Sequence, residues 1–97
     1  MKLIDFIKSR DYDILPRWID KDTLAEIDYL NMVIRINLEL ILTQIVAHEF
    51  LHDCYPDLAE GKILKKTIRY LNRMKVPEIK AVGRETFRQI IFREVKK

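Results

Sequence analysis

The chain has 97 residues, which is enough for one small domain with a core but too few for two domains of ordinary size. Apolar residues make up 48% and aromatic residues 9% of it, which excludes a disordered tail. The 18 basic residues are diluted by 15 acidic ones to a net charge of +3, and no nucleic-acid-binding motif accompanies them. We therefore expect one folded domain over residues 1–97 that does not bind nucleic acid.

The number of cysteines and the hydropathy of the chain indicate the cellular compartment. Cys54 is the single cysteine, so an internal disulfide framework is excluded. The start of the chain lacks the pattern of a cleaved leader, and no apolar run has the length that a bilayer span requires. These features predict a soluble, cytoplasmic protein without a membrane span.

The first third of the chain mixes helical and strand-like patterns. Residues 2–9 place their apolar side chains on one face, which predicts a short amphipathic helix. Residues 14–19 read as an apolar connector. Residues 23–37 alternate apolar and polar positions and are rich in β-branched residues, which predicts a β-hairpin with its turn near Asn31.

A long helix is predicted from residue 38 to about residue 55. Asn37 is well placed to cap its start, and Pro56 must end it, because proline disfavours the helical conformation of the residue before it. Residues 38–47 are apolar around almost the whole circumference of this helix. This pattern predicts a helix that is buried on most sides.

The next helix is predicted over residues 58–75. At 100° per residue, Glu60 falls in the middle of its inward-facing apolar stripe, where a carboxylate needs a partner. The other members of the stripe are Ile63, Leu64, Thr67, Ile68, Leu71 and Met74. A simpler interpretation makes Asp57 and Glu60 a capping box. The cations of this helix are interpreted as its solvated face: Lys62, Lys65, Lys66, Arg69 and Arg73.

Helical spacing returns over residues 82–97, after Pro77 and Gly83. Its apolar side chains group on one side and are Phe87, Ile90, Ile91 and Val95. A one-sided helix on a flexible joint can lie in the cleft of its own molecule or of a neighbouring copy. We therefore treat residues 77–97 as a candidate inhibitory segment and as a candidate surface for a homodimer.

Both histidines of the chain belong to the sequence His48-Glu49-Phe50-Leu51-His52. On a helix, residues four apart lie on one face, so the two imidazoles can bind one metal ion. Glu49 is about 100° away and reaches a water molecule at that ion. This H-E-x-x-H pattern is typical of zinc hydrolases, in which the glutamate is the general base and acid and is not a ligand.

A catalytic zinc site needs a third protein ligand, and no histidine is left to supply it. We favour Glu60, with Glu78 and Glu85 as the next candidates. Asp53 and Asp57 are weaker, and Cys54 is expected to be a buried thiol turned away from the metal. Candidate donors to a developing oxyanion are Tyr55, Tyr70 and Arg84.

The hairpin, the helix with the H-E-x-x-H sequence, and the following segment from Tyr55 to Glu60 resemble the gluzincin metallopeptidases. The small size is similar to that of the minigluzincins. No Gly-x-x-His follows His52, which excludes the metzincin pattern. The resemblance implies one zinc ion bound by His48, His52 and Glu60, with Glu49 as the catalytic glutamate. It further implies a fold like the catalytic domains of certain membrane metallopeptidases, and latency imposed by the C-terminal segment.

The sequence thus predicts an α+β fold, in which a small hairpin or sheet packs on the active-site helix beside two or three further helices in a zincin-like arrangement. The expected activity is zinc-dependent hydrolysis of peptide bonds in peptides or unfolded proteins, in a latent form. The alternative is a catalytically silent zincin-like domain for binding or regulation, with a structural metal. A third possibility is an α-rich interaction protein without metal.

Overall fold

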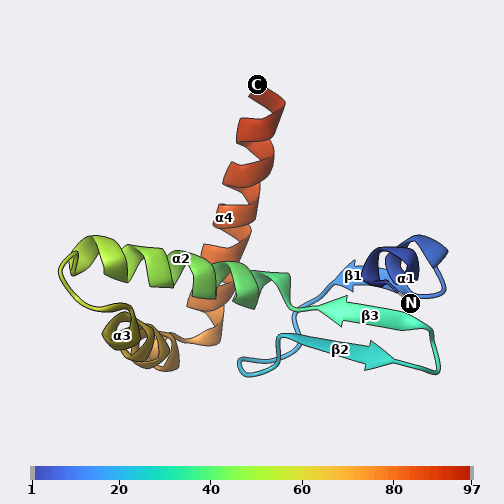
Figure 1. Ribbon diagram of the computed structural model, residues 1–97, viewed down its shortest axis with the longest axis horizontal. Coiled ribbons are helices and arrows are strands. Elements are labelled where there is room, and N and C mark those ends of the chain that lie inside the picture. The colour runs from blue at the N-terminus through green and yellow to red at the C-terminus, as the bar shows by residue number, and fades with distance from the viewer. Residues whose placement is uncertain (1, 97) are drawn as a thin grey trace. The chain divides into compact units, whose positions relative to one another are not determined.

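The computed structural model describes residues 2–96 and shows an α+β protein, with four helices and one three-stranded sheet in that range (Figure 1). The expected α+β class is therefore confirmed. The chain divides into two compact units, one ending at Leu38 and the other beginning at Glu39. The expectation of a single domain stays a prediction.

The first unit consists of the helix α1 (Leu3–Ser9) and the strands β1 (Asp13–Pro16), β2 (Ala25–Asp28) and β3 (Val33–Ile36). The strand order is β1-β3-β2, so β3 is central. It runs antiparallel to β2 and parallel to β1. The predicted N-terminal helix and the predicted hairpin are both present.

The strand β1 overlaps residues 14–19, which were expected to form an apolar connector. In the sheet, Asp13 pairs with Val33 and Pro16 pairs with Ile36. Proline is tolerated here because it ends an edge strand, where a missing N–H costs little. A run of four residues that ends in proline carries little local signal, and its partner strand lies far along the sequence. The connector prediction is therefore wrong for this segment.

The turn of the hairpin is held by the carboxylate of Asp28. It accepts hydrogen bonds from the side-chain amide of Asn31 (2.9 Å) and from its backbone N–H (3.0 Å), and it pairs with Arg35 at 3.2 Å. The Asn31 side chain, its N–H and Arg35 lower the pKa of Asp28 to about 2. Because the folded-state pKa is depressed, this stabilisation is present above the ordinary pKa and is lost as the pH falls toward 2. The predicted turn position near Asn31 is correct.

Asn37 precedes the long helix as expected but does not cap it. Its side-chain amide donates hydrogen bonds to the carbonyls of Asp20 (2.8 Å) and Thr23 (2.9 Å), and its Oδ1 is buried without a hydrogen-bond partner among the described residues. Asn37 therefore ties the loop before β2 to the end of β3. The local pattern predicted that the Asn37 side chain caps the helix, but in the structure it bonds to the loop before β2 instead.

The second unit is built from α2 (Leu38–Cys54), α3 (Glu60–Arg73) and α4 (Val76–Lys96). Pro56 follows the end of α2 closely, as predicted. Within the described range, none of the helices combines the length and the apolar character that crossing a membrane requires.

The helix α2 is buried along one stripe only. Its buried residues are Leu40, Thr43, Ala47 and Leu51. Three apolar side chains of the same helix are exposed, namely Ile45, Val46 and Phe50. The expectation that α2 is buried on most sides therefore holds only in part, since Ile45 and Val46 are the two exposed residues among 38–47. Apolar residues around a whole helix predict full burial only where enough neighbours exist to cover it, and this unit has two other helices.

The helix α4 is continuous from Val76, so the predicted joint at Pro77 and Gly83 does not exist. Pro77 lies in the first turn, where a helix has no partner for the N–H that proline lacks. Gly83 lies in the interior of α4 and is buried. A Cβ atom on Gly83 would lie 2.5 Å from the Cα atom of Glu39, so glycine permits α4 to cross the first turn of α2 at close range.

Further contacts fix this crossing. The hydroxyl of Thr43, which is fully buried, donates a hydrogen bond shared between the carbonyls of Glu39 (2.7 Å) and Ile79 (2.8 Å). Arg84 Nε donates to the carboxylate of Glu39 at 3.1 Å. The N-terminal half of α4 therefore supports the helix that carries both histidines.

Three of the apolar residues expected to group on α4 lie within its continuous helical range, where their spacing places them on one side. Phe87, Ile90 and Ile91 are each close to half exposed. The side chain of Val95 lies outside the described residues.

We expect the substitution Gly83→Ala to lower the free energy of unfolding by about 1–3 kcal/mol, because the added methyl group overlaps with backbone that cannot move independently. Gly61→Ala is the matched control. Nothing lies within 4 Å of a Cβ atom at Gly61, so alanine there gains up to about 1 kcal/mol of helix propensity. Urea unfolding followed by circular dichroism measures both. Equal stability of the two variants would contradict the close crossing.

Candidate metal centre

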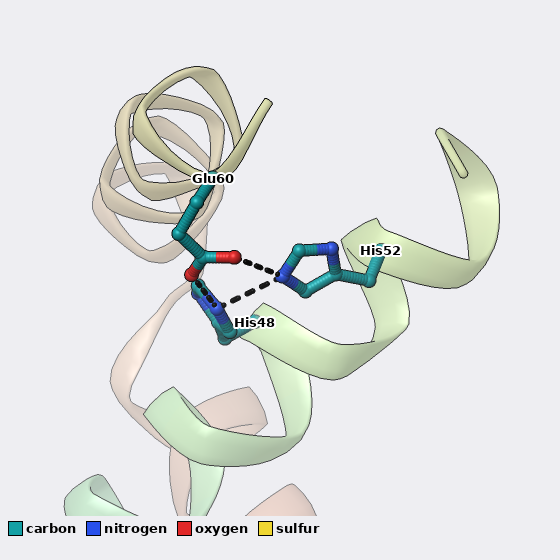
Figure 2. Close-up of side chains that lie close together, drawn as sticks. All are labelled: His48, His52 and Glu60. Atoms are coloured by element: carbon teal, nitrogen blue, oxygen red, sulfur yellow. Dashed lines mark hydrogen bonds and ion pairs between the residues drawn. The ribbon is translucent and has the colours of Figure 1, made fainter. Parts of the chain in front are cut away.

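The local sequence brings three potential metal ligands together. His48 and His52 lie one turn apart on α2, and their rings point to the same side (Figure 2). The chain then turns at Pro56, and Glu60 is the first residue of α3. Its carboxylate extends toward both rings, and a negative charge is favourable at this end of a helix.

The three donor atoms form a tight triangle. The Nε2 atom of His48 lies 2.7 Å from Oε1 of Glu60, and the Nε2 atom of His52 lies 2.8 Å from Oε2. The two Nε2 atoms are 3.2 Å apart. Side-chain exposure is 20% for His48, 32% for His52 and 60% for Glu60, so the triangle is sheltered by the helices and open on the glutamate side.

Protons alone do not satisfy this triangle. A carboxylate only accepts hydrogen bonds, so its contacts with His48 and His52 require a proton on both Nε2 atoms. The contact between the two Nε2 atoms requires one of them to be bare, that is, without a proton, so that it can accept a hydrogen bond. One-to-one hydrogen bonds therefore satisfy two of the three contacts at most. A single cation that accepts a lone pair from each of the three residues satisfies them all.

The donor set fits zinc. Two imidazoles and one carboxylate are the three protein ligands of a common class of catalytic zinc site, and the fourth position is left for water or substrate. Zinc bonds of 2.0–2.2 Å in tetrahedral geometry separate two donors by about 3.3–3.6 Å. The distances of 2.7–3.2 Å come close to this, so a small outward shift of the side chains would accommodate the ion.

A groove of about 480 Å³ adjoins the triangle. Its lining residues in the described part of the chain come from α2 and α3 and are Gln44, Ile45, His48, Glu49, Glu60, Leu64, Thr67, Ile68 and Leu71. Glu49 is exposed, and its carboxylate forms no hydrogen bond or ion pair within residues 2–96. It is therefore available to a molecule in the groove.

The other carboxylates considered as third ligand lie apart from the triangle. Among the described residues, the cluster with metal-binding spacing contains only the two histidines and Glu60. Glu78 is exposed on α4, and Glu85 is bound by Arg88 and Gln89, which lower its pKa to about 2. Asp53 and Asp57 are exposed as well.

Cys54 and the capping box differ from the sequence expectations. Cys54 is the last residue of α2 and is exposed, so the expectation of a buried thiol is wrong. The N-cap residue of α3 is Ala59, without a side-chain hydrogen bond, so Asp57 forms no capping box with Glu60. Glu60 is thereby left to face the histidines.

The stripe predicted on α3 is only partly buried. Ile63, Thr67 and Met74 are buried, whereas Leu64 and Ile68 are about half exposed. The cations of α3 lie outside this stripe, and four of the five are exposed, as expected.

None of the three candidate oxyanion donors lines the groove. Tyr55 lies under the ammonium group of Lys66, which is 4.5 Å from its ring centroid. Tyr70 packs against Phe50, with ring centroids 5.9 Å apart. Arg84 is paired with Glu39 at the crossing of α2 and α4.

Two polar residues of the groove were given no functional role from the sequence. Gln44 lies one turn before His48 on α2, and Thr67 lies two turns after Glu60 on α3. Helical periodicity places both on the ligand-bearing faces, and this signal was available in the sequence. The periodicity does not reveal which polar residue on such a face approaches a histidine.

Comparisons of this chain with protein-family models, with curated proteins and with solved structures found no match. The chemistry of the site is therefore argued from its own residues.

We expect Glu60→Gln to weaken zinc binding by about 10-fold or more, because the neutral amide is a poor zinc ligand. The matched control is Glu78→Gln, which removes one exposed negative charge away from the triangle. Competition with a chromogenic chelator measures the affinity of each variant. If both variants bind zinc as tightly as the unmodified chain, Glu60 is not a ligand.

Proposed function

We propose that this chain is a zinc-dependent peptidase of the gluzincin type, with a zincin-like active site made by α2 and α3. The observation that carries the proposal is the convergence of His48, His52 and Glu60 in a triangle that protons alone cannot satisfy, beside the free carboxylate of Glu49. One zinc ion per chain is the proposed cofactor.

Zinc in this triangle would supply a Lewis acid that activates a water molecule at neutral pH and polarises the scissile carbonyl. Glu49 follows His48 directly in α2 and lines the same groove. Its carboxylate takes a proton from the attacking water and delivers it to the nitrogen of the leaving amine. In this way Glu49 acts first as general base and then as general acid.

The apolar lining of the groove indicates the kind of substrate that it would bind. Exposed apolar side chains line it, and Ile45, Leu64 and Ile68 are between 49% and 58% exposed. Such a surface loses water favourably when an apolar side chain of a peptide covers it. We therefore propose extended peptides or unfolded proteins as substrates, with an apolar residue near the scissile bond.

The exposure of the triangle favours catalysis over the alternative, a binding or regulatory domain with a structural metal. Structural zinc sites are closed by four protein ligands, whereas catalytic sites keep one position open. Here three ligands are proposed, and Glu60 is 60% exposed.

Glu49→Gln should reduce the cleavage of an unfolded protein such as casein by about 100- to 10,000-fold, because the amide cannot accept the proton of water. Zinc content, measured by elemental analysis, should remain at about one ion per chain, since Glu49 is not a ligand. Asp53→Asn is the control for a lost negative charge at an exposed position of α2. Cleavage by zinc-loaded Glu49→Gln at the unmodified rate would exclude the mechanism. Absence of cleavage by every form of the chain would favour the structural-metal alternative.

The latency implied by the family resemblance stays a prediction and has its own test. If the C-terminal segment blocks the groove, a chain that ends at Gln89 should cleave casein faster than the full chain. This truncation keeps Ile79, Gly83 and Arg84, which hold α4 against α2. Size-exclusion chromatography of the full chain shows whether the segment acts within one molecule or between two. Equal rates would contradict latency imposed by residues 90–97 and leave the peptidase proposal in place.

A further inference from the structure

The side chain of Thr67 lies directly behind one of the proposed ligands. Thr67 is 6% exposed, and its Oγ1 atom is 3.5 Å from Nδ1 of His48, the ring nitrogen that does not face Glu60. The same oxygen donates a hydrogen bond of 2.8 Å to the carbonyl of Ile63, one turn earlier in α3. Thr67 therefore joins the backbone of α3 to the imidazole ring of His48.

The number of protons on the Thr67 hydroxyl decides which group donates in its contact with His48. A threonine hydroxyl has one proton, and the short hydrogen bond to the Ile63 carbonyl uses it. Only lone pairs of Oγ1 remain to face His48, so the ring must be the donor, with a proton on Nδ1. A neutral imidazole with its proton on Nδ1 has a bare Nε2, and this is the atom that faces Glu60 and His52.

We propose that Thr67 is a positioning residue, which holds the His48 ring in the orientation and tautomer that present a bare Nε2 atom to the metal. This proposal rests on the proposed function in one respect, the binding of zinc by the triangle. A ligating histidine generally donates its second ring N–H to an acceptor, which fixes the ring and raises its basicity. In this chain the acceptor is a hydroxyl, and Ile63 orients it.

The decisive comparison is Thr67→Val against Thr67→Ser. Valine keeps the shape of threonine but cannot accept a hydrogen bond, so the dissociation constant for zinc should rise by about 10- to 100-fold. Serine keeps the hydroxyl and should retain an affinity close to that of the unmodified chain. Competition with a chromogenic chelator measures each affinity, and circular dichroism confirms that each variant is folded.

Thr43→Val is the matched control. Thr43 is also a buried threonine bonded to the carbonyl one turn earlier, but its hydroxyl contacts Ile79 rather than a histidine. This variant should lose stability and keep its zinc affinity. A loss of affinity equal to that of Thr67→Val would assign the effect to general destabilisation and overturn the proposal.

A second measurement uses the unmodified chain and needs no variant. In the zinc-loaded protein with ¹⁵N-labelled histidine, NMR should find a proton on Nδ1 of His48. Coordination through Nδ1 would overturn the proposal, as would equal zinc affinities of Thr67→Val and the unmodified chain or failure of Thr67→Ser to restore binding. Absence of zinc binding by the unmodified chain would instead overturn the proposed function and this inference together, so the two failures are distinguishable.

Discussion

The architecture of the site depends on one constraint. Two imidazole nitrogens and one carboxylate, which all offer lone pairs, must lie within hydrogen-bonding distance of each other and still be satisfied. His48 and His52 are held one turn apart by α2, and Glu60 meets them from the first turn of α3. The segment between the two helices is short, so a glutamate at the start of α3 remains close to the end of α2. The carboxylate offsets the cost of placing two half-buried imidazoles side by side. The same arrangement leaves the triangle open to solvent on the side of Glu60, which is 60% exposed.

Support for this arrangement comes from the other end of α2. Gly83 allows α4 to approach the backbone of Glu39, and Thr43 ties the two helices through Ile79. These contacts involve backbone atoms and a fully buried hydroxyl, so they fix the crossing more firmly than apolar packing alone. The histidines lie on the same helix, beyond Thr43. The crossing therefore fixes the start of the helix that carries both rings.

The incomplete burial of α2 and α3 bears on the proposed function. Ile45, Leu64 and Ile68 belong to patterns that predict core positions, yet they line the groove beside Glu49. In a unit of three helices, some apolar residues remain uncovered for lack of neighbours. Apolar surface next to a proposed catalytic carboxylate is suited to hold the side chains of an extended peptide. The sequence pattern thus predicts core positions for these residues, whereas the structure exposes them along the groove.

The sequence by itself determined the features that depend on local chemistry. Helical periodicity placed His48 and His52 on one face, Pro56 ended their helix, and the count of histidines left a carboxylate as the proposed third ligand. The projection of Glu60 onto the inner face of its helix selected the residue that the structure brings to the two rings. Each of these inferences uses residues within or next to one helix, or a simple count.

Only the tertiary structure decided features that depend on contacts between segments distant in the sequence. It paired β1 with β3, drew Asn37 away from the cap of α2, and made Gly83 a point of close approach instead of a joint. It also placed Thr67 behind His48. The physical reason is that a helical pattern fixes which face a side chain occupies, whereas the partner on that face is chosen by how the helices pack, and local periodicity carries no record of that choice.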